Sequence, residues 1–164
     1  MSMLQAGGLD LLTDAARPAD DHNPRGYFEH SRVLQLAQNA DWLQDCGGQA
    51  VKILYRQLEL VPADLQARVL VVERDLREVV ASQQAMLPAQ QDNWNWLDLF
   101  GREQARFRAW LAQQKWPVLP VAHARLLREP GLVAAELQDF LGRPLDLSAM
   151  AARVDPHLYR NRRC

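Results

Sequence analysis

The sequence predicts an open α/β fold with a mainly parallel sheet flanked by helices, in a single domain that spans residues 1–164. The segment 68–73 is an almost continuous apolar and β-branched run, which is typical of a strand buried on both faces of a parallel sheet. A capped helical pattern follows it, and a further strand and helix come after. This alternation is typical of α/β folds, and 164 residues is the size of one ordinary domain.

Two other segments, 50–55 and 117–122, have strand character. Pro120 lies inside the second of them and lacks a backbone N–H, so we expect this strand to lie at an edge of the sheet or to end early. Ligands of open α/β sheets bind beyond the carboxyl ends of the strands. The residues directly after each strand are therefore the candidates for a site.

The helix after the segment 68–73 has signals at both ends. Asp75 is expected to cap it, with Glu78 three residues later in a capping-box arrangement. Pro88 is expected to end it. By contrast, the segment 20–26 is rich in Asp, Asn, Pro and Gly and predicts a loop.

Two more helices are expected further along the chain. The first is amphipathic and runs from about residue 94 to 114. Its predicted apolar face consists of Leu97, Phe100, Phe107 and Leu111. The second spans residues 130–141, with Pro130 at its first position and Gly142 directly after its last.

The composition limits the classes of function. Nineteen Lys and Arg against twenty Asp and Glu give a net charge of −1, so a cationic field for nucleic acid is not expected. No apolar run approaches the ~20 residues that span a bilayer, and the first residues do not form a secretory signal. Cys46 and Cys164 cannot make a disulfide framework, and the four histidines lack metal-ligand spacing, so no metal is expected. We therefore expect a soluble cytoplasmic protein that does not bind membranes.

Arg74 is the leading candidate for a binding residue, because it stands between the best strand and a helix start. Helix N-termini favour anions, and a guanidinium can bind phosphate through two N–H groups. Ser82 supplies a hydroxyl eight residues later, about 12 Å along a helix. The alternative is an Arg paired with Asp75 or Glu78 and a Ser that faces a neighbouring helix.

The segment 72–83, VERDLREVVASQ, resembles the 3′-phosphate-binding segment of sulfotransferases that use 3′-phosphoadenosine 5′-phosphosulfate (PAPS). In that family an Arg ends a strand and a Ser follows eight positions later. Other segments are similar to bacterial members in the same order along the chain: 6–14, 21–29, 50–53, 121–130, 140–142 and 154–162. The resemblance covers most of the chain, and the order of the segments is more specific than any one of them.

The resemblance implies a three-layer, P-loop-like fold and PAPS as co-substrate. It places Arg74 and Ser82 on the 3′-phosphate of the nucleotide. It places His123 where many members have a Tyr near the adenine, and it brings Arg160 and Arg162 of the C-terminal segment toward the same phosphate. Lys52, in the segment 50–53, is the one candidate catalytic residue. The acceptor hydroxyl or amine cannot be named from the sequence.

Two family features have no counterpart in this sequence. One is the first strand with its loop, which is rich in Gly, Pro and Ser or Thr and holds the 5′-phosphosulfate. The pair Gly7-Gly8 is too short a stretch to form such a loop. The other is the His of many relatives, replaced here by Arg56, which cannot act as a base at ordinary pH. We therefore expect an N-terminally truncated member that begins one strand and one loop late and has no turnover.

A second class of function stays open beside the sulfotransferase family. A sheet that lacks one strand exposes an apolar edge, which invites pairing with another chain. The chain could then be a non-catalytic nucleotide-binding or protein-interaction module, including a homo-oligomer joined through that edge. Nucleic-acid binding through Arg102, Arg106, Arg108 and the C-terminal arginines is disfavoured by the near-neutral charge.

Overall fold

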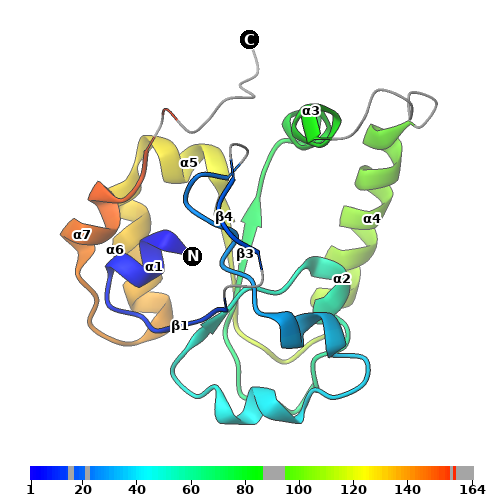
Figure 1. The fold of residues 1–164 in the computed structure, drawn as a ribbon, viewed down its shortest axis with the longest axis horizontal. Coiled ribbons are helices and arrows are strands. Elements are labelled where there is room, and N and C mark those ends of the chain that lie inside the picture. The colour runs from blue at the N-terminus through cyan, green and yellow to red at the C-terminus, as the bar shows by residue number, and fades with distance from the viewer. Residues whose placement is uncertain (15–16, 21–22, 87–94, 156, 158–164) are drawn as a thin grey trace.

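A computed structural model describes residues 1–14, 17–20, 23–86, 95–155 and 157. Within these residues the protein is a mixed α/β structure with seven α-helices, two 3-10 helices and two small parallel sheets (Figure 1). The strands are β1 (Leu11–Leu12), β2 (Ala50–Val51), β3 (Val69–Glu73) and β4 (Val118–Ala122). The helices are α1 (Ser2–Ala6), η1 (Ser31–Gln35), η2 (Asp41–Asp45), α2 (Tyr55–Leu58), α3 (Leu76–Met86), α4 (Trp96–Leu111), α5 (His123–Arg128), α6 (Pro130–Leu141) and α7 (Leu147–Ala152).

Each sheet has two strands. β3 pairs in parallel with β4 over five residues, from Val69 opposite Val118 to Glu73 opposite Ala122. Among the described strands β4 has one neighbour, so the edge position predicted from Pro120 is confirmed. The other sheet pairs β1 with β2 over two residues.

The predicted strand at 50–55 is wrong beyond Val51. β1 offers only Leu11 and Leu12 as partners, so the ladder ends at Val51. A strand is stable only where its backbone groups are paired. The chain therefore leaves the sheet and begins α2 at Tyr55.

α6 lies where it is expected, whereas α4 is shorter than the predicted span of about 94–114 by two residues at its start and three at its end. Asn95 caps α4 by accepting the N–H of Asp98, and Gly142 ends α6 in the left-handed region at φ 66°. Leu97 departs from the predicted apolar face of α4, because its side chain is exposed. The predicted helix stop at Pro88 lies outside the described residues.

Two apolar clusters lie on opposite sides of the strands. In Figure 1, α1, α6 and α7 lie on one side, and α2 and α4 lie on the other. The α6 cluster is the buried set Met3, Leu4, Leu9, Val121, Val133, Ala134, Leu137 and Met150. The α4 cluster is the buried set Val33, Leu36, Trp42, Leu43, Val61, Val69, Phe107, Leu111 and Trp116.

Hydropathy adds one finding. None of the described helices combines the length and the apolar character that a membrane-spanning segment requires.

Candidate functional site

The candidate site is built at the carboxyl end of β3, where the chain turns directly into α3. Asp75 makes this turn: its Oδ1 accepts the N–H of Arg77 at 2.8 Å, and its carbonyl accepts the N–H of Val79 at 3.0 Å. The predicted helix cap at Asp75 is therefore confirmed. Arg74 is held between the last strand residue and this cap.

Arg74 lies along one face of α3. Its Nε is 3.0 Å from Oε2 of Glu78, and the two side chains are 25% and 9% exposed. Glu78 is the one buried charged residue among those that the structure describes. Ser82 follows Glu78 by four residues and is half-buried, so both lie on the same helix face. The alternative interpretation of Arg74 as an ion-pair partner of Glu78 is thus confirmed.

His123 lies beside Arg74 because of the strand register. Glu73 is opposite Ala122 in the β3–β4 ladder, so the next residues, Arg74 and His123, leave the sheet as neighbours. Burial lowers the pKa of the His123 imidazole, the positive charge of Arg74 lowers it further, and the carboxylate of Glu78 opposes both. His123 is the first residue of α5.

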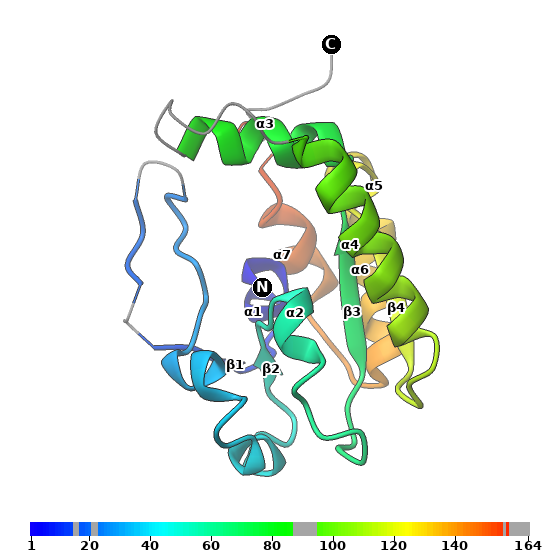
Figure 2. The same cartoon turned by 90° about the vertical axis from the view of Figure 1, so that its right-hand side faces the viewer.

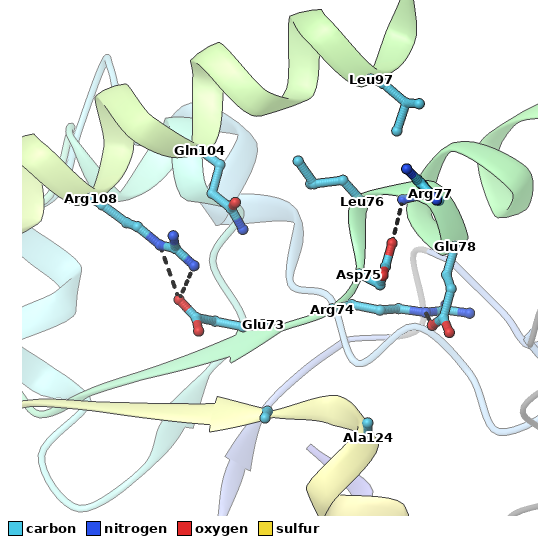
Figure 3. A pocket seen from close by; sticks show the side chains of 11 residues that line it. Glu73, Arg74, Asp75, Leu76, Arg77, Glu78, Leu97, Gln104, Arg108 and Ala124 are labelled. Carbon is cyan, nitrogen blue, oxygen red and sulfur yellow. Dashed lines mark hydrogen bonds and ion pairs between the residues drawn. The ribbon is translucent and has the colours of Figure 1, made fainter. Parts of the chain in front are cut away.

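A pocket of about 670 Å³ opens next to Arg74, between the start of α3 and α4 (Figure 3). On its α4 side, Arg108 binds Oε1 of Glu73 through Nε at 3.2 Å and Nη2 at 2.8 Å. The other lining residues are Arg74, Asp75, Leu76, Arg77, Glu78, Leu97, Gln104, Ala122 and Ala124. Neither Ser82 nor His123 lines the pocket. Arg74 and Glu78 do line it, and Glu78 lies on the same face of α3 as Ser82.

The chain matches no protein-family model, no curated protein and no solved structure. The resemblance of the segment 72–83 to the sulfotransferases therefore has no support beyond the residues of the sequence itself. What the site can bind follows from its geometry and charge.

The charge of the pocket lining is balanced. Three guanidinium groups face three carboxylates there, those of Glu73, Asp75 and Glu78. An anion that binds an arginine of this site has to displace the carboxylate that pairs with that arginine. Removal of that carboxylate should therefore strengthen anion binding rather than weaken it.

Lys52 lies away from this pocket and is not among its lining residues. Its Nζ donates to the carbonyl of Tyr27 at 2.8 Å and to Oε1 of Glu29 at 3.1 Å. These contacts fit an amine that ties the loop at Tyr27 and Glu29 to the end of β2. Arg56 Nε pairs with Oε2 of Glu103 at 3.2 Å.

The remaining candidates add nothing to the site as described. Arg160 and Arg162 lie outside the described residues. In the part of the chain that the structure covers, no group of three His, Cys, Asp or Glu side chains could hold a metal. The sequence did not predict three residues of this pocket, Glu73, Gln104 and Arg108. A contact between a strand end and a distant helix leaves no local signal in the sequence.

His123 gives the site a pH dependence that can be measured. Its pKa is below the ordinary 6.5, so below that pH the unfolded state binds more protons than the folded state. The stability should therefore fall as the pH drops below 6.5, by at most about 1.4 kcal/mol per pH unit for one proton. We expect His123→Gln to reduce this slope in urea unfolding between pH 5 and 7.5. A His157→Gln variant controls for loss of a histidine, and an unchanged slope in His123→Gln would contradict the assignment.

Proposed function

We propose that this protein binds a 3′-phosphorylated adenosine nucleotide of the PAPS type, as the resemblance to the sulfotransferases implies. Arg74, Ser82 and the start of α3 would bind the 3′-phosphate, and His123 would lie near the adenine. The observation that carries the proposal is the placement of Arg74. It leaves the carboxyl end of β3, lies along the α3 face that holds Ser82, and has His123 as its neighbour from β4.

The chemistry of these groups suits a phosphate. The guanidinium supplies charge and N–H donors in a planar fork, and Ser82 supplies a hydroxyl donor one turn beyond Glu78. The N-terminal end of α3, an 11-residue helix, adds a favourable dipole. A phosphate would take the place of the Glu78 carboxylate on Arg74.

The proposal includes the three-layer, P-loop-like arrangement. Both sheets would then belong to one layer between two layers of helices. The division of the core supports this, because each apolar cluster contains residues packed from both sheets. The site would lie at the carboxyl ends of β3 and β4, the position that ligands take in open α/β sheets.

A complete sulfotransferase would transfer the sulfuryl group of PAPS to a hydroxyl or amine of an acceptor. In this chain Lys52 is bound to Tyr27 and Glu29, and Arg56 cannot accept a proton. These features favour the non-catalytic alternative, a nucleotide-binding module without turnover. Sulfate transfer from PAPS by the purified chain would contradict this part of the proposal.

The 3′-phosphate is the group to test. We expect 3′-phosphoadenosine 5′-phosphate to bind at least about tenfold tighter than 5′-AMP, because hydrogen bonds to a charged group contribute about 1.5–3 kcal/mol. Isothermal titration calorimetry at fixed ionic strength measures both affinities, and the two ligands differ only in that phosphate. Equal affinities, or no binding of either nucleotide, would overturn the proposal.

A further inference from the structure

Gln104 contributes to the pocket a side-chain amide that the fold itself does not use. The residue lies on α4, is half-buried and lines the pocket of about 670 Å³ beside the start of α3. Within the part of the chain that the structure describes, its amide makes no hydrogen bond. An amide has an acceptor oxygen and two N–H donors, so a ligand in the pocket can bind both kinds of group.

The Arg108–Glu73 pair offers a second donor and acceptor to the same pocket. Both hydrogen bonds of the pair end on Oε1 of Glu73, from Nε and Nη2 of Arg108. Oε2 of Glu73 and Nη1 of Arg108 make no hydrogen bond among the residues that the structure covers. The two side chains are 32% and 55% exposed, so a ligand can reach both groups. Figure 3 shows Gln104 between this pair and Leu76.

The charged groups that line the pocket already have partners of opposite charge or lie close to one. The three contacts are Arg108 to Glu73 at 2.8 Å, Arg74 to Glu78 at 3.0 Å, and Asp75 to the backbone N–H of Arg77 at 2.8 Å. A ligand with a net charge of either sign has to separate one of these contacts to find its own partner. A neutral ligand leaves all three in place, so the lining favours a neutral ligand.

Apolar side chains form the other walls of the pocket. Leu97 of α4 is 42% exposed, and Leu76 packs on α4, where its Cδ1 is 3.9 Å from the position of a Cβ added at Gly101. Ala122 and Ala124 add small side chains from the end of β4 and the start of α5. Figure 2 shows α3 across the upper end of the fold with the first turns of α4 beside it. The pocket volume lies in the range of about 300–1,000 Å³ that small-molecule sites have.

We propose that this pocket binds a small neutral molecule that carries amide groups on an apolar body. An amide has a donor next to an acceptor, which matches what Gln104 and the Arg108–Glu73 pair each offer. These two contacts would orient the ligand, and its apolar body would lie against the leucine side chains. The inference does not depend on the proposed nucleotide site, because Ser82 does not line the pocket.

Three leucine derivatives of similar size test the preference for a neutral amide. N-acetyl-L-leucinamide is neutral and has two amides. N-acetyl-L-leucine replaces one amide by a carboxylate, and glycyl-L-leucinamide keeps both amides and adds an ammonium group. Titration of the ¹⁵N-labelled protein at fixed ionic strength, followed by two-dimensional NMR, measures the three affinities.

We expect N-acetyl-L-leucinamide to bind with a dissociation constant in the millimolar range, as suits so small a ligand. Each charged compound should bind at least about fivefold more weakly, because it has to separate an existing ion pair. Equal or tighter binding of either charged compound, or no binding of the neutral one, would overturn the proposal. This comparison needs no variant of the protein.

A matched pair of variants locates the ligand. Gln104→Leu keeps the approximate size of the side chain and removes its donor and its acceptor, so we expect N-acetyl-L-leucinamide to bind at least about fivefold more weakly. Gln113→Leu changes an exposed residue just beyond α4 and should bind as the wild type does. Circular dichroism checks both folds. Equal affinities of the two folded variants would overturn the assignment.

The same titration separates this pocket from the nucleotide proposal. Ser82→Ala changes the proposed phosphate site and leaves the pocket lining intact. We therefore expect it to bind N-acetyl-L-leucinamide as the wild type does. A loss of this binding in folded Ser82→Ala would contradict the placement of the ligand.

Discussion

Met150→Ala should lower the free energy of unfolding by about 2–5 kcal/mol, the range for truncation of a large buried apolar side chain. Met150 is 0% exposed and lies in the α6 cluster, where α7 packs on α1 and α6. A Cβ added at Gly7 would come within 2.7 Å of the Met150 Cγ and Sδ, so the backbone directly after α1 lies close against this side chain. The surrounding helices leave little freedom for the cavity to collapse.

Urea unfolding at neutral pH measures this effect. Leu132→Ala is the matched control, because Leu132 lies on α6 next to the same cluster but is 60% exposed. We expect the control to change the stability by no more than about 0.5 kcal/mol. A loss below about 1 kcal/mol in Met150→Ala, or equal losses in both variants, would show that α7 does not pack on α1 as described.

The parts of the fold that local signals specify could be predicted from the sequence. A continuous β-branched run, a capping Asp and a flanking Pro and Gly are each contained within a few residues. They placed β3, α6 and the start of α3 within one residue of their observed bounds. Pro120 gave the edge position of β4 for the same reason, since one missing N–H excludes a neighbour on that side.

The elements that depend on distant partners could not be predicted. β2 ends at Val51 only because β1 is two residues long, and no residue near Val51 records that. The short helices α5 and α7 have too few turns for a clear period, and packing stabilises them; Met150 anchors α7 in this way.

In the candidate site, too, contacts between residues close in sequence could be predicted and contacts between distant residues could not. The four-residue spacing of Arg74 and Glu78 indicates their ion pair, and the sequence could not decide between that pair and an anion site. His123 reaches Arg74 through the β3–β4 register, which is a property of two strands 45 residues or more apart. The Arg108–Glu73 pair joins α4 to the end of β3 and has no local signature either.

Arg74→Ala and Glu78→Gln should change nucleotide affinity in opposite directions. Loss of the guanidinium removes the main positive charge that would bind the 3′-phosphate. We therefore expect 3′-phosphoadenosine 5′-phosphate to bind about 10- to 100-fold more weakly. Loss of the Glu78 carboxylate frees Arg74 from the ion pair at 3.0 Å. An ion pair of this kind contributes up to about 1 kcal/mol, so we expect binding to tighten by about 3- to 5-fold.

The opposite signs distinguish a binding role from a structural one. If Arg74 and Glu78 only stabilise the turn into α3, both variants lower the stability and both weaken binding. If the carboxylate holds the place of a phosphate, Glu78→Gln binds more tightly even where its own thermal midpoint is lower. Arg102→Ala is the matched control, since Arg102 makes an exposed four-residue pair with Asp98 at 3.1 Å on α4. Calorimetric titration of all three variants with the same nucleotide decides between the two roles, and weaker binding in Glu78→Gln would exclude competition at Arg74.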